Sequence, residues 1–95
     1  MYKIVLHEQV LSKDFKELDK PEIEKIFRAI KEKLETDPLT FGRPLRKELK
    51  GYYRLRVNFY RVIYKILKQE VVVSVIKIGK RKDSEVYEDA RKRTQ

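Results

Sequence analysis

Three consecutive runs rich in Val, Ile and Tyr, at residues 52–57, 60–67 and 71–78, most constrain the fold of this chain. Such residues favour strands, and only short polar links near Asn58-Phe59 and Lys68-Gln69 separate the runs. Strands joined by links this short pair antiparallel with their neighbours. We therefore predict a three-stranded meander in the second half of the chain, with Gly79 ending its last strand.

The first half has a different periodicity. Residues 2–6 are typical of a short strand, and residues 8–18 place Leu11, Phe15 and Leu18 at helical spacing. Asp19-Lys20-Pro21 marks a break and a new helix start. The second helix ends around Thr36-Asp37-Pro38, and its apolar stripe comprises Ile23, Ile26, Phe27, Ile30 and Leu34.

The predicted order is β-α-α-β-β-β, which indicates the α+β fold class. We expect an N-terminal strand and a helical hairpin packed on one face of a mostly antiparallel four-stranded sheet. A short C-terminal helix is allowed from about Ser84. At 95 residues the chain is long enough for one core, so residues 1–95 are predicted to form a single domain.

Positive charge is concentrated in the second half of the chain. Residues 1–42 hold 8 basic and 9 acidic residues, whereas residues 43–95 hold 16 basic and 6 acidic residues, a net of +10. The simpler interpretation is a solvated surface that keeps the protein soluble. Segregation of the charge instead favours a binding face for a polyanion such as nucleic acid.

Several classes of site are excluded by composition. The chain has no Cys and only His7, which rules out a disulfide framework, a thiol nucleophile and a metal site built on Cys or paired His. No apolar run could span a bilayer and no signal peptide follows Met1, so we expect a cytoplasmic protein without a membrane partner.

A two-residue turn at Asn58-Phe59 would set Arg56 directly opposite Arg61, with Arg54 on the same face. The opposite face would carry the apolar residues that pack on the helices, namely Tyr53, Leu55, Val57, Val62 and Tyr64. Like charges facing each other across strands are destabilising unless water or an anion offsets them. For any one Arg an ordinary solvated face is the simpler interpretation, but three that converge favour a phosphate site.

The ordered motifs of the second half resemble the RelE branch of the RelE/ParE toxin superfamily. The resemblance is carried by Leu49-Lys50-Gly51-Tyr52-Tyr53-Arg54-Leu55-Arg56-Val57, Tyr60-Arg61-Val62-Ile63-Tyr64, Val75-Ile76-Lys77-Ile78-Gly79-Lys80-Arg81 and Ser84-Glu85-Val86-Tyr87. It covers nearly the whole chain, and the helical hairpin fits the family in position and length.

This resemblance implies a toxin of a type II toxin–antitoxin pair, with a cognate antitoxin as its partner. RelE-type toxins enter the ribosomal A site and cut mRNA there without a metal or cofactor, by attack of a ribose 2′-hydroxyl on the adjacent phosphate. By the resemblance, Arg61 grips the phosphate, and Arg81 binds it or assists the leaving 5′-oxygen. Tyr87 stacks on the displaced base or helps with proton transfer.

One departure from the family concerns the two basic positions of the strand at 52–57. The best-known RelE pattern has Lys there, and a crowded Lys can act as a base, whereas Arg54 and Arg56 stay protonated. We therefore expect both to act as electrostatic clamps. The 2′-hydroxyl would then be activated by Tyr87, by water or by the ribosome.

Further basic residues suit contacts with ribosomal RNA, although solvation alone would also explain them. They are Arg43, Arg46, Lys47 and Lys50 in the loop, and Lys80, Lys82 and Arg91–Arg93 in the tail. Two other functions stay open: a ParE-like gyrase poison, and a nonenzymatic basic module that binds nucleic acid. ParE-like chains usually lack the C-terminal Arg and Tyr pair, so Arg81 and Tyr87 favour the nuclease.

Overall fold

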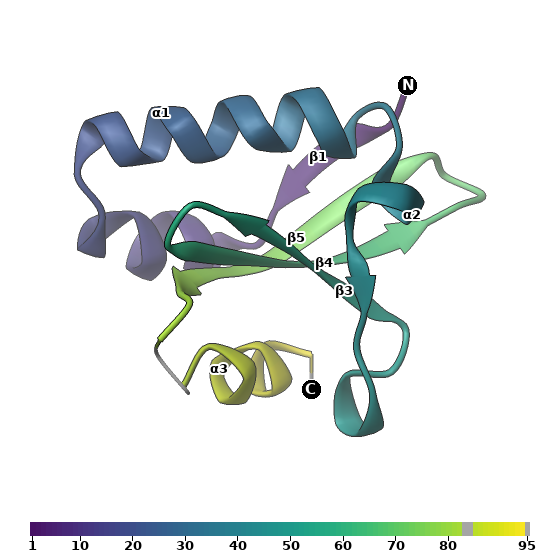
Figure 1. Ribbon diagram of the computed structural model, residues 1–95. Helices are drawn as coiled ribbons and strands as arrows, with labels where there is room; N and C mark the ends of the chain where they lie inside the picture. The colour runs from purple at the N-terminus through teal and green to yellow at the C-terminus, as the bar shows by residue number, and fades with distance from the viewer. Residues whose placement is uncertain (83–84, 95) are drawn as a thin grey trace.

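The protein is described from a computed structural model that covers residues 1–82 and 85–94. Its centre is a five-stranded sheet with the strand order β1-β5-β4-β3-β2 (Figure 1). The strands are β1 (Lys3–Leu6), β2 (Arg43–Pro44), β3 (Tyr52–Val57), β4 (Tyr60–Leu67) and β5 (Val72–Lys80). Only the β1–β5 pair is parallel, which confirms the predicted α+β class and the mostly antiparallel sheet.

The meander has the predicted register. Val57 pairs with Tyr60 and Arg56 with Arg61 across a turn at Asn58-Phe59, where Asn58 adopts a φ of 53°. The predicted four strands become five because Arg43–Pro44 pairs with β3. Gly79 does not end β5, because the strand continues to Lys80, which pairs with Tyr60.

The second predicted helix is confirmed as α1 (Lys20–Ala29), which winds on through a π-helical turn at Ile30–Leu34. Its stripe is buried at Ile26, Ile30 and Leu34, which pack on the face of the sheet that Leu55, Val62 and Tyr64 line. A four-residue helix, α2 (Pro38–Phe41), follows it and precedes β2.

The first predicted helix differs in winding and therefore in which face is buried. Val10–Asp14 form a π-helical turn and Phe15–Glu17 a 3-10 turn. This irregular winding shifts the inward side by one residue, so that Val10 is fully buried while Leu11 is 54% exposed. Of the three residues that the sequence places at helical spacing, Leu11 is exposed, whereas Phe15 and Leu18 pack against the core.

The C-terminal helix α3 (Glu85–Arg93) covers the opposite face of the sheet from α1 (Figure 1). Val86 and Ala90 pack there on Ile63, Ile76 and Leu49, forming a second small core. Gly79 allows this close approach, because a Cβ at that position would lie 2.6 Å from the Val86 Cγ2 atom. The predicted start at Ser84 lies outside the described residues.

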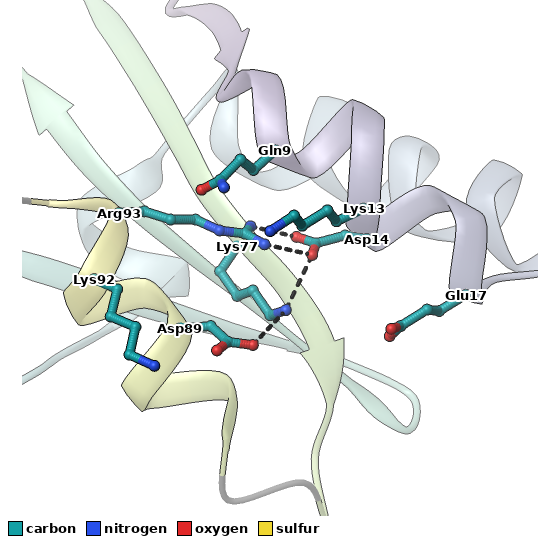
Figure 2. A pocket seen from close by; sticks show the side chains of 8 residues that line it. All are labelled: Gln9, Lys13, Asp14, Glu17, Lys77, Asp89, Lys92 and Arg93. Atoms are coloured by element: carbon teal, nitrogen blue, oxygen red, sulfur yellow. Dashed lines mark hydrogen bonds and ion pairs between the residues drawn. The ribbon is translucent and has the colours of Figure 1, made fainter.

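A buried ionic cluster fastens α3 to the sheet and to the N-terminal half (Figure 2). Asp14 accepts hydrogen bonds from Lys77 Nζ at 3.0 Å, from the Ile78 backbone N–H at 2.9 Å and from both Nη atoms of Arg93 at 2.8 and 2.9 Å. Lys77 also pairs with Asp89 at 3.1 Å. Both oxygens of the Asp14 carboxylate therefore accept hydrogen bonds. The residues of the ionic cluster come from three separate segments of the chain.

None of the helices within residues 1–82 and 85–94 has the length and apolar character needed to cross a membrane.

Asp14→Asn tests the ionic cluster. The substitution keeps the shape of the side chain but leaves Lys77 and Arg93 without their shared carboxylate in a buried site, which we expect to lower the free energy of unfolding by about 3–5 kcal/mol. Urea unfolding followed by circular dichroism measures it. Asp19→Asn is the matched control, because Asp19 is exposed and its side chain makes no capping hydrogen bond. Equal stability of the two variants would contradict the assignment.

Candidate active site

The antiparallel pairing of β3 and β4 brings three predicted site residues onto one face of the sheet. Arg56 lies opposite Arg61, and Arg54, two residues earlier on β3, points to the same side. The alternating residues Leu55, Val57 and Val62 are buried on the α1 side. The apolar half of the alternation thus fixes the strands, and the basic half is turned toward α3.

Helix α3 places Tyr87 between two of these arginines. Arg54 Nη1 donates a hydrogen bond to the Tyr87 hydroxyl oxygen at 3.0 Å. The guanidinium carbon of Arg61 lies 5.1 Å from the centroid of the Tyr87 ring, which is cation–π geometry. One arginine therefore orients the phenol oxygen and the other covers a face of the ring.

Arg56 lies near the charges of several other arginines. The charges of Arg54 and then Arg81, with smaller effects of desolvation, Arg61 and Arg43, lower the pKa of its exposed guanidinium. Such a cluster of like charges becomes more stable when it binds an anion. We name Arg54, Arg56, Arg61, Arg81 and Tyr87 the arginine cluster.

Arg81 is held against the turn between β3 and β4. Its backbone N–H donates to the Phe59 carbonyl oxygen at 2.7 Å, and its Nη1 donates to the Asn58 carbonyl oxygen at 3.2 Å. These bonds fix the end of β5 beside the hairpin, so the guanidinium of Arg81 stays close to Arg56. The five residues predicted for catalysis are thus gathered at one end of the sheet.

Arg61 has a buried hydrogen-bond donor without an acceptor among the described residues. Its Nε atom is enclosed and makes no hydrogen bond with any residue in the described part of the chain. An enclosed donor of this kind costs free energy, and such groups in native proteins call for an explanation such as a catalytic role.

A groove of about 590 Å³ leads away from the cluster on the side of the 45–49 loop. Arg46, Lys47, Arg54 and Tyr87 line it. Its two carboxylates, Glu48 and Glu88, are both engaged by Arg91, Glu48 at 3.1 Å. The free charge of this groove is therefore positive.

A second pocket of about 540 Å³ lies at the other side of the cluster. It is lined by Phe59, Tyr60, Lys80, Arg81 and Lys82. Arg54 and Tyr87 line the first groove and Arg81 lines this pocket, so the cluster contributes residues to both hollows.

The predicted RNA-binding residues lie in four places. Arg43 pairs with Arg54 across β2 and β3, Arg46 and Lys47 line the groove, and Lys80 and Lys82 line the pocket. Lys50 is exposed just beyond the groove residues without lining either hollow.

The tail residues at 91–93 differ from the prediction. The Arg93 side chain is only 5% exposed, because it binds Asp14, and Arg91 is occupied by Glu48 and Glu88. Their charges are used in packing α3, which leaves Lys92 as the exposed member.

The described residues do not form a set of metal ligands. Within residues 1–82 and 85–94, no three His, Asp or Glu side chains are grouped to hold a metal ion. The 240 Å³ pocket of Figure 2, lined by Asp14, Lys77, Asp89 and Arg93 among others, is built around ion pairs that are already satisfied.

The buried ionic cluster around Asp14 was not predicted from the sequence. A signal was present in Lys77, a lone cation inside the apolar run 71–78, since a buried Lys requires an anionic partner. The sequence could not show that this partner would be Asp14, which is 63 residues away along the chain.

Comparison with known proteins identifies the family. Residues 4–85 match the family described as "ParE toxin of type II toxin-antitoxin system, parDE". The mRNA interferase toxin RelE of Escherichia coli is 50% identical over 40 residues, which are 42% of this chain and 42% of that protein. In that alignment the chain spans less than half the length of its curated relative.

Solved structures extend the similarity over the whole fold. The isolated E. coli RelE toxin matches with a TM-score of 0.70 and 30% identity, covering 100% of both chains. The RelBE2 toxin–antitoxin complex of Mycobacterium tuberculosis matches with a TM-score of 0.79 and 26% identity, covering 86% of this chain and 93% of that one. The chain therefore belongs to the RelE/ParE superfamily of toxins from type II toxin–antitoxin systems.

Proposed function

We propose that this protein is a ribosome-dependent endoribonuclease that cuts mRNA in the A site and so inhibits translation. The observation that carries the proposal is the arginine cluster, in which Tyr87 is held between Arg54 and Arg61. The similarity to the E. coli mRNA interferase toxin RelE supports it.

The chemistry follows from where charge develops. When a ribose 2′-oxygen attacks the adjacent phosphorus, the new P–O bond forms as the bond to the 5′-oxygen breaks, and the phosphoryl oxygens gain negative charge on the way. Guanidinium groups placed beforehand stabilise that charge without reorganisation. Arg61 and Arg56 hold the phosphate in this scheme, while Arg54 and Arg81 approach it from either side.

Tyr87 is assigned as the proton donor to the leaving 5′-oxygen. Its oxygen accepts the hydrogen bond from Arg54, so its own O–H proton is directed elsewhere. Because Arg61 covers one face of the ring, only the other face is available for a base. The proton of the 2′-hydroxyl then goes to water or to a ribosomal group, because Arg54 and Arg56 hold their protons at neutral pH.

The route of the RNA runs along the two hollows beside the cluster. Arg46 and Lys47 line one and Lys80 and Lys82 the other, so a single strand that crosses the cluster meets cations on both sides. The protein acts in the cytoplasm, where its ribosomal partner is found.

A cognate antitoxin is the second partner. A similar structure is a toxin–antitoxin complex. An antitoxin segment that carries carboxylates and apolar side chains would neutralise the arginine cluster and exclude RNA from it.

Substitution of the β3 arginines tests the cluster. We expect Arg54→Ala and Arg56→Ala each to slow single-turnover cleavage of mRNA on programmed ribosomes by about 100- to 1,000-fold, the usual effect of removing one preorganised donor. Primer extension on the message locates and quantifies the cuts. Arg28→Ala is the control, since Arg28 is exposed on α1 across the sheet. Wild-type rates in both cluster variants would refute the assignment.

The same assay separates the three functions. Cleavage at A-site codons is expected here. Inhibition of gyrase supercoiling with the message intact would instead indicate a ParE-like poison, and salt-sensitive binding without either effect would indicate a nonenzymatic module.

Tyr87→Phe and Tyr87→Ala divide the roles of the phenol. Phe keeps the ring but removes the proton, so we expect cleavage to slow by about 100-fold or more while affinity for the ribosome holds. Ala should weaken both. Single-turnover rates measured across toxin concentrations give the two quantities, and full activity of the Phe variant would reassign Tyr87 to stacking alone.

A further inference from the structure

The most exposed aromatic side chain outside the arginine cluster is Phe59. It lies at the tip of the hairpin between β3 and β4 and is 77% exposed. A two-residue turn ordinarily carries polar or small residues, and the fold does not require an apolar ring there, because the ring contributes to neither core cluster.

Charges around the ring are unevenly distributed. On the β5 side, Phe59 and Tyr60 share the 540 Å³ pocket with Lys80, Arg81 and Lys82. On the α1 side, a hollow of about 330 Å³ is lined by Glu22 and Lys25 together with Asn58 and the same two aromatic residues. An anionic ligand would therefore approach the ring from the β5 side.

The turn that carries the ring is also fixed relative to the proposed chemistry. Arg81 binds the turn through its backbone N–H and its guanidinium, at the carbonyl oxygens of Phe59 and Asn58. Arg81 lines the pocket beside Phe59 and belongs to the arginine cluster. A polymer held by the cluster therefore has its next unit within reach of Phe59.

We propose that Phe59, Lys80 and Lys82 form a nucleotide subsite that holds the unpaired base and phosphate of the RNA next to the cleaved bond. The base stacks on the exposed ring and the two ammonium groups bind the phosphate. An aromatic ring surrounded by cations is the arrangement by which proteins hold single-stranded nucleic acid. This proposal rests on the proposed function and adds a residue that selects and aligns the substrate.

Binding can be measured separately from cleavage. A message with a 2′-O-methyl group at the attacking ribose cannot be cut, so the affinity of the toxin for ribosomes programmed with it reports the subsite alone. We expect Phe59→Ala to weaken that affinity about 5- to 100-fold, the effect of one aromatic–base stack. Phe59→Trp should retain it, and Phe41→Ala, which removes a 48% exposed ring on α2, should change nothing.

An abasic message identifies the base. Removing the base at each position flanking the cut in turn should abolish the penalty of Phe59→Ala at one position only, while Lys80→Ala and Lys82→Ala should still weaken binding there. Unchanged affinity in Phe59→Ala, or a penalty that survives every abasic position, would overturn the subsite. Loss of antitoxin binding with intact ribosome binding would also overturn it, by assigning the ring to the antitoxin.

The two proposals fail separately. If wild-type toxin leaves an ordinary message intact, the nuclease function is wrong whatever Phe59 does. If the message is cut and the affinity of Phe59→Ala equals that of wild type, only the subsite is wrong.

Discussion

The arrangement of the arginine cluster depends on one buried carboxylate, that of Asp14. Asp14 holds Lys77 of β5 and Arg93 at the end of α3, and this double contact draws α3 onto the face of the sheet that β3 and β4 fill with arginines. Without α3 that face would hold four cations and no phenol. A residue of the neutral N-terminal half thereby positions Tyr87 in the basic half, and the energy of the contact comes from satisfying two buried cations with one anion.

The molecule uses its carboxylates selectively. Asp14 and Asp89 neutralise Lys77 and Arg93, and Glu48 and Glu88 neutralise Arg91, all of which are cations that attach α3. The arginine cluster receives no carboxylate within the described residues, and repulsion by the neighbouring arginines lowers the pKa of Arg56. The apolar packing of the same two strands on α1 offsets the unfavourable free energy of that repulsion. An anionic ligand would remove the cost, which is why the cluster favours binding.

The sequence pattern predicted the pairing of β3 with β4, because this pairing depends on residues that are close together in the chain. The alternation in 52–57 and 60–67 and the short turn between them were enough to place Arg56 opposite Arg61. The burial of Val10 instead of Leu11 could not be predicted, because the spacing of apolar residues does not distinguish a π-helical turn from an α-helical one. The covering of the basic face by α3 could not be predicted either, because it depends on the contact between Asp14 and Arg93, which are 79 residues apart in the sequence.

Arginine at both basic positions of β3 limits which groups could act as the base in the proposed reaction. A Lys in such a crowd could lose its proton and serve as the base, but a guanidinium keeps its proton at neutral pH even where neighbours lower its pKa, as they do for Arg56. In the proposed reaction the chain would supply charge stabilisation through its arginines and a proton through Tyr87, and the acceptor for the 2′-hydroxyl proton would have to come from water or from the ribosome. A nuclease built in this way would be incomplete off the ribosome, which gives a physical reason for the ribosome dependence proposed above.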